Sequence, residues 1–165
     1  FSNNGLNNVN DVNTVLKECR RVSKIGAQLV FTYNTDKTMR EFYSEFENLL
    51  RDKKMTSQIV LMKEHLYKKR RPVEEFVRLL NQNGYVLNEV SHDEYAYRFT
   101  DGTAMFNHFL IKLAFIDSWK ELVPEEKQQD FFAELLDRLN QLSERIGYLN
   151  LSVPFAIIDC EKVRE

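Results

Sequence analysis

The side chains most suited to acid–base or nucleophilic chemistry are three histidines and two cysteines, and they are scattered along the chain. His65, His92 and His108 are far apart in sequence, and Cys19 and Cys160 lie near opposite ends. This spacing matches no known metal-ligand motif, so we expect no metal site. No Cys–His or Ser–His arrangement is apparent that would make a nucleophile and its base.

His108 is the histidine with the most informative surroundings. The segment 105–116 is apolar nearly all round, which predicts a buried helix, but Asn107, His108 and Lys112 form a narrow polar stripe on it. Burying such groups without partners costs about 1–3 kcal/mol each, so they face water or line a polar pocket. Trp119 follows closely, either as part of a core or as a wall of a ligand site.

Composition excludes several classes of protein. The 165 residues are 43% hydrophobic and 29% charged, with a net charge of −2, which argues against a dedicated nucleic-acid binder. No apolar run approaches the roughly 18 residues of a membrane span, and two cysteines suit a reduced, cytoplasmic protein. The basic run 68–71 (KKRR) is typical of a solvated face, with an anion site as the alternative.

Glycine is sparse. The closest two, Gly84 and Gly102, are 18 positions apart, so the sequence contains no glycine-rich loop for a phosphate or dinucleotide. The chain begins at Phe1 without a methionine. We therefore expect a piece of a larger protein.

Hydrophobic periodicity predicts an α/β chain that forms a single domain over residues 1–165. Helices are expected over 12–22 and 39–50, from Pro72 to Gly84, and from Pro124 to Gly147. Strands are expected over 27–33, 85–90 and 149–158, and over 95–99 after a polar break at 91–93. The near-continuous hydrophobicity of 27–33 is typical of a strand covered on both faces.

These segments resemble the C-terminal half of class I S-adenosylmethionine-dependent methyltransferases. The opening block is similar to the family's pattern from the end of the fourth strand into the fifth, through Ser2, Asn3, Leu6, Val9, Asp11, Leu16, Glu18, Arg21, Val22, Lys24 and Gly26. Asn8 stands where an aromatic residue is frequent, and Ile25-Gly26-Ala27 replaces the usual Pro-Gly-Gly. Segments 68–87, 99–124 and 149–163 are similar to the sixth strand with its helix, a helical insertion and the seventh strand.

The resemblance implies the C-terminal half of a Rossmann-like methyltransferase sheet. The family's strand order is three-two-one-four-five-seven-six, so this chain would supply the end of strand four and strands five, six and seven. A helical insertion, placed at 104–147, would precede the last strand. The glycine-rich turn that grips S-adenosylmethionine would lie upstream of Phe1, so this chain alone is expected to bind the cofactor poorly and to be inactive.

The resemblance also implies where the site lies, because ligands sit beyond the carboxyl ends of the strands. Cofactor contacts are expected at Ser2, Asn3 and Asn4. Contacts to a small methyl acceptor are expected at Tyr33, Asn34, Tyr97, Phe99 and Trp119, whose rings allow a flat or apolar substrate. If the acceptor is a hydroxyl or thiol, His108 is the candidate base.

Three further expectations follow. A fifth strand without its usual neighbour would leave an open sheet edge, which predicts a homodimer or a domain swap. The alternative function is a non-catalytic α/β module that binds a protein or a small ligand. A complete enzyme of another class is a third interpretation, which the lack of a recognisable catalytic constellation disfavours.

Overall fold

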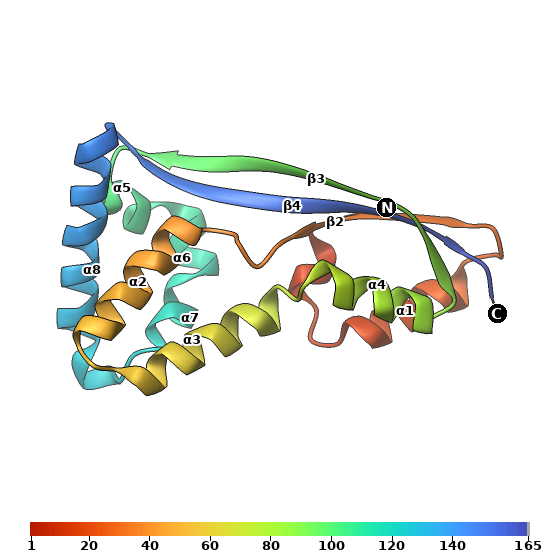
Figure 1. Cartoon of the computed structure of the whole chain (residues 1–165), viewed down its shortest axis with the longest axis horizontal. Helices are drawn as coiled ribbons and strands as arrows, with labels where there is room; N and C mark the ends of the chain where they lie inside the picture. Colours follow the sequence, from red (N-terminus) through yellow and green to blue (C-terminus); the bar gives the residue numbers. More distant parts are fainter. Residues whose placement is uncertain (165) are drawn as a thin grey trace. The chain divides into compact units, whose positions relative to one another are not determined.

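The computed structural model describes residues 1–164 and has a four-stranded sheet with helices (Figure 1). The elements are β1 (Ser2–Asn3), the 3-10 helix η1 (Gly5–Asn8), α1 (Val12–Val22), β2 (Gln28–Asn34), α2 (Arg40–Asp52), α3 (Thr56–Lys69), α4 (Val73–Gln82), β3 (Tyr85–Phe99), α5 (Gly102–Asn107), α6 (Phe109–Ala114), α7 (Ile116–Lys120), α8 (Glu125–Ile146) and β4 (Leu149–Lys162). The mixed α/β class expected from the sequence is confirmed.

The chain forms two compact units. Unit 1 contains residues 1–38, 66–95 and 153–164, and unit 2 contains residues 39–65 and 96–152. The single domain over 1–165 and the insertion at 104–147 stay predictions.

The sheet order is β1-β2-β4-β3. β1 is parallel to β2, with Ser2 opposite Phe31 and Asn3 opposite Thr32. β4 is antiparallel to β2 over the whole of β2, from Gln28 opposite Glu161 to Asn34 opposite Phe155. The last strand of the chain therefore lies between β2 and β3.

The core of unit 1 lies against one face of β2. Phe31 and Tyr33 are fully buried there, and the ring of Phe76 on α4 packs against both, at centroid distances of 5.3 and 4.8 Å. Leu16 on α1 and Leu80 on α4 complete the contact. The opposite face of β2 is only half-buried, so the expected cover on both faces is not what this unit shows.

The helix α1 begins and ends as the sequence predicts. The Asp11 carboxylate accepts hydrogen bonds from the backbone N–H groups of Asn13 and Thr14, which caps the helix. At the other end, Lys162 Nζ donates to the carbonyl oxygens of Arg20 and Ser23, each at 2.8 Å. A cation at this position satisfies carbonyls that the last turn leaves open.

Unit 2 has an aromatic core. Phe42 of α2 stacks on Trp119 of α7 at 3.9 Å between centroids, and Phe46 of α2 contacts Phe131 of α8 at 4.9 Å. α8 carries Phe131 and its other buried residues at helical spacing and ends at Gly147, whose φ of 85° is the left-handed conformation that glycine adopts easily.

Two sequence predictions are wrong in detail. The segment 105–116 is not one buried helix: it divides among α5, α6 and α7, and Phe109 and Leu113 are 75% and 72% exposed. The polar break expected at 91–93 does not interrupt β3. Backbone pairing with β4 does not depend on side-chain polarity, so the strand continues through exposed polar residues. The helix α3 was not predicted at all.

Candidate functional site

The carboxyl ends of β1 and β2 lie side by side in unit 1, and Thr32 is at the centre of their contacts. Thr32 Oγ1 donates to Asn3 Oδ1 at 2.5 Å and accepts from the backbone N–H of Asn4 at 2.9 Å. Asn4 takes up the left-handed conformation (φ 53°), which asparagine tolerates better than most residues. Ser2 is half-buried beside them. The three residues expected at the cofactor are thus held together at one edge.

Asn7 extends this edge after β1 has ended. Its Nδ2 donates to the carbonyl oxygen of Asn34 at 3.0 Å, and its Oδ1 accepts from the backbone N–H of Asn34 at 2.9 Å. This side chain therefore replaces a missing strand partner for the end of β2. The Oδ1 atom of the Asn34 side chain is buried and has no hydrogen-bond partner. Sequence reasoning named Asn34 and missed Asn7.

The side chain of Tyr33 points into the core of unit 1 and not toward this edge. Its ring is 1% exposed in the core of unit 1, and its hydroxyl donates to the carbonyl oxygen of Arg71 at 2.5 Å. Burial is the main cause that raises the pKa of this phenol above its ordinary value, so Tyr33 is a neutral donor at physiological pH. Its role as a substrate contact stays a prediction.

The segment that Tyr33 holds contains a residue that sequence reasoning did not single out. Arg70 follows the last residue of α3, is only 7% exposed, and its Nη1 is buried without a hydrogen-bond partner. Arginine is almost never fully buried unless it is paired. The signal in the sequence was the basic run 68–71, which we interpreted as a solvated face with an anion site as the alternative.

The remaining predicted residues belong to unit 2. His108 is exposed and caps α6, with Nδ1 accepting from the backbone N–H of Leu110 at 3.3 Å. Its ring contacts Phe99 edge to face at 5.3 Å between centroids, so two predicted residues are brought together here. Tyr97 is half-buried on β3.

Trp119 belongs to the core of unit 2. It is 0% exposed, and its indole Nε1 donates to the Tyr43 hydroxyl at 3.0 Å. A tryptophan with its one donor satisfied and its ring stacked on Phe42 needs no ligand to complete it. Its assignment as a substrate contact stays a prediction.

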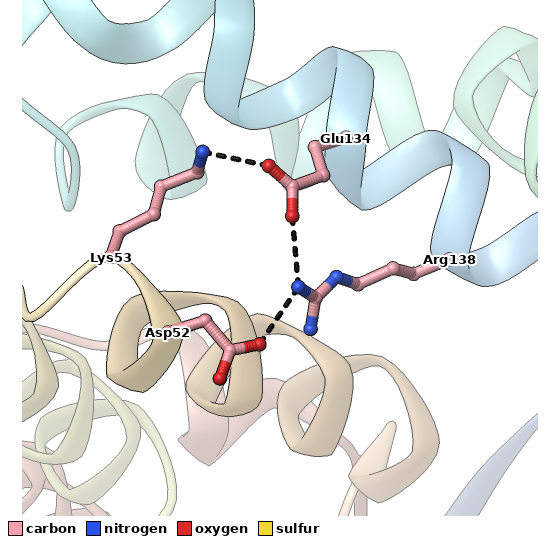
Figure 2. A network of polar contacts seen from close by, with 4 residues as sticks. All are labelled: Asp52, Lys53, Glu134 and Arg138. Carbon is pink, nitrogen blue, oxygen red and sulfur yellow. Dashed lines mark hydrogen bonds and ion pairs between the residues drawn. The ribbon is translucent and has the colours of Figure 1, made fainter.

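Charged side chains also line a hollow of about 450 Å³ in unit 2, beside α8. Two residues of its wall, Glu134 and Arg138, belong to a network in which Arg138 Nη2 binds Asp52 Oδ2 and Glu134 Oε1, each at 2.8 Å, and Lys53 Nζ binds Glu134 Oε2 at 2.7 Å (Figure 2). In this network both cations, Arg138 and Lys53, already have carboxylate partners. The network therefore connects α2 to α8 and offers no unpaired charge to a ligand.

Within residues 1–164, no three His, Cys, Asp or Glu side chains are grouped so that they could hold a metal ion. No helix in this part of the chain is both long and apolar enough to cross a membrane.

Comparison with known proteins gives similarity in structure only. No family model and no curated protein matches the sequence. Several solved structures are similar to this chain, and two of them share 15% identity with it. One, described as a "putative methyltransferase" from Bacillus halodurans C-125, has a TM-score of 0.49, with 99% of this chain and 68% of that chain covered. The other, described as a "putative sarcosine dimethylglycine methyltransferase" from Galdieria sulphuraria, has a TM-score of 0.41, with 98% and 51% covered.

Proposed function

We propose that this chain is the C-terminal, acceptor-side part of a class I S-adenosylmethionine-dependent methyltransferase that acts on a small molecule. The observation that carries the proposal is the order of the strands. The resemblance in sequence implies the order four-five-seven-six, with the seventh strand antiparallel. The sheet order β1-β2-β4-β3, with β4 antiparallel to β2, supports that correspondence.

The correspondence assigns each strand a place. β1 is the end of strand four, β2 is strand five, β3 is strand six and β4 is strand seven. Because β4 lies between β2 and β3, the connection from β2 to β3, through α2, α3 and α4, must skip one strand position, which β4 then fills. A simple meander would instead put β4 at the edge beside β3, so this order is informative.

The residues at the carboxyl ends of β1 and β2 suit one wall of a cofactor and acceptor site. The buried, unpartnered Oδ1 of Asn34 and the polar groups of Ser2, Asn3 and Asn4 give this wall hydrogen-bonding capacity. S-adenosylmethionine, when bound, supplies an activated methyl group on a sulfonium centre. The contribution of this chain is to orient the acceptor for in-line attack and to exclude water.

His108 has a constraint as a base. A neutral imidazole has one lone-pair nitrogen, and in His108 that nitrogen, Nδ1, accepts the hydrogen bond that caps α6. Nε2 then carries the proton and can only donate. Proton abstraction by His108 therefore requires the cap to break first.

The coding sequence upstream of Phe1 provides the first test. We expect it to encode a strand, a glycine-rich turn, a helix and an acidic residue that closes the next strand. The longer protein should then bind S-adenosylmethionine in calorimetry, whereas residues 1–165 alone should bind it weakly or not at all. A start codon directly before Phe1, or a longer protein without cofactor affinity, would refute the proposal.

A non-catalytic binding module is the second candidate, favoured by one observation. Phe109 and Leu113, one turn apart on α6, are 75% and 72% exposed. A partner that covers both side chains would remove apolar surface from water, which favours binding. The upstream sequence separates the candidates, because only the methyltransferase needs a cofactor-binding half.

A further inference from the structure

Arg70 is a buried cation without a partner. It is 7% exposed, its Nη1 has no hydrogen-bond partner, and no carboxylate forms an ion pair with it among residues 1–164. Its neighbour Arg71 differs, because it pairs with Glu75 at 3.4 Å and its side chain is 35% exposed. A buried guanidinium without a partner has lost its hydration, and nothing in the described residues replaces it.

The structure holds Arg70 at the carboxyl end of β2. On one side the Tyr33 hydroxyl binds the carbonyl oxygen of Arg71 at 2.5 Å. On the other, Asn7 Nδ2 lies 3.5 Å from the carbonyl oxygen of Lys69 and 3.0 Å from that of Asn34. The segment 69–71 is thus anchored from both sides to the edge where Asn34 Oδ1 is also buried without a partner.

This edge therefore has an unsatisfied cationic donor and an unsatisfied neutral acceptor. Neither is explained by packing within unit 1, since each leaves a polar atom buried at a cost. A ligand that brings an anionic oxygen and an N–H or O–H group would satisfy both at once.

We propose that Arg70 binds a carboxylate of the methyl acceptor and that Asn34 Oδ1 accepts a hydrogen bond from the same molecule. The forked donors of a guanidinium match two carboxylate oxygens. Arg71 already pairs with Glu75, so Arg70 brings one uncompensated positive charge to this segment, and a single negative charge fits it better than a dianion. The assignment of this anion to the acceptor rests on the proposed function.

Acetate is the probe for the anion site, and the measurement is the melting temperature of residues 1–165. Sodium acetate is compared with sodium chloride at equal ionic strength, because acetate also stabilises proteins in general. We expect acetate to raise the Tm of the wild type by about 2–4 °C more than that of Arg70→Met. Arg71→Met is the matched control and should keep the wild-type response, and neutral acetamide should give none.

Three results would overturn the site. The first is an equal acetate response in the wild type and Arg70→Met. The second is loss of the response in Arg71→Met alone. The third is a larger response to inorganic phosphate than to acetate, which would contradict the preference for a single charge. If Arg70→Met does not fold, Arg70→Lys keeps the charge but loses the fork, and its response to acetate should be at least halved.

A second measurement separates the acceptor from the cofactor, which carries a carboxylate of its own. In the longer protein, Arg70→Gln should leave the dissociation constant for S-adenosylmethionine within about twofold of the wild type. A loss of tenfold or more would assign Arg70 to the cofactor and overturn the acceptor assignment. The acetate experiment needs no cofactor, so the anion site and the proposed function can fail separately.

Discussion

At the scale of single residues, Trp119 shows how a side chain with functional potential can be used by the core. Its ring stacks on Phe42 and its Nε1 bonds to the Tyr43 hydroxyl. Both polar partners are enclosed, so each would be left unsatisfied if the other were removed. The pair therefore makes packing in unit 2 specific.

A double-mutant cycle on this pair measures that coupling. Tyr43→Phe should lower the free energy of unfolding by about 1–3 kcal/mol, because it leaves the indole N–H buried without an acceptor. Trp119→Phe should cost about 2–4 kcal/mol through lost packing and the same hydrogen bond. The double variant should cost about 1 kcal/mol less than the sum of the two. Additive losses in urea unfolding would show that the hydrogen bond contributes nothing.

His108 permits a sharper test than its removal alone. His108→Ala removes the cap of α6 and should lower stability by about 0.5–2 kcal/mol, whereas His108→Asn retains a capping group and should cost much less. If His108 is the catalytic base, both variants of the longer protein should lose turnover. The fall in turnover toward acidic pH should also disappear from their pH profiles. Wild-type turnover in His108→Asn would leave only the structural role.

At the scale of elements, α5 packs closely on α8 at Gly102. A Cβ at this position would lie 2.8 Å from Leu139 Cβ and 3.1 Å from Asn140 Oδ1, and the Gly102 N–H already donates to that oxygen at 2.9 Å. Gly102→Ala should therefore lower the free energy of unfolding by about 1–3 kcal/mol in denaturant melts. Thr103→Ala, exposed on the same turn, is the control and should change it by less than about 0.5 kcal/mol. Equal effects would show that α5 moves to accommodate the methyl group.

The network in Figure 2 predicts that the free energy of unfolding depends on pH. Hydrogen bonds from Lys53 and then Arg138 lower the pKa of Glu134 below its ordinary value. A carboxyl with a lowered pKa in the folded state stabilises the protein fully above its unfolded pKa, about 4.3, and loses that contribution as pH falls through the folded pKa.

Arg138→Ala should accordingly cost up to about 1 kcal/mol at pH 7, since these side chains are partly exposed. The difference from the wild type should shrink below about pH 4 and at high salt. Arg145→Ala, further along α8, serves as the control. An Arg138 effect that stays constant from pH 7 to pH 3 would contradict an electrostatic origin.

At the scale of the whole molecule, the edge of the sheet remains the feature with most consequence for assembly. β1 pairs with only two residues of β2, Phe31 and Thr32, so within residues 1–164 the stretch 28–30 has no strand beside it on that side. Open edges of this kind pair with other chains.

We therefore expect residues 1–165 to form a dimer or a domain swap at high concentration in light scattering. Gln28→Lys places a charge at this edge and keeps a partner, because Gln28 already bonds to Asp159 on β4 at 2.8 Å. The variant should reduce the dimer fraction. A wild-type chain that stays monomeric at the highest concentration would exclude pairing through this edge.

Much of the fold could be predicted from the sequence because it depends on local patterns. The helices α1, α2 and α8 follow from the 3.6-residue spacing of their apolar side chains, and Gly147 marks a helix end because its left-handed backbone favours glycine. The strand segments and the α/β class follow from similar signals. The site residues Ser2, Asn3 and Asn34 were expected from the family resemblance, which implies ligands beyond the carboxyl ends of the strands, and their role stays a prediction.

Tertiary structure alone decided the rest, because those features depend on groups far apart in the chain. Whether Arg70 is a solvated cation or a buried one depends on Tyr33 and Asn7, which bind the carbonyl oxygens of Arg71 and Lys69 from 38 and 62 residues away. The same holds for Trp119, enclosed by a helix that ends 67 residues earlier. β3 is continuous because β4 supplies its backbone partners, whatever its side chains are. A sequence read locally specifies which elements form, whereas burial and pairing are properties of the contacts between them.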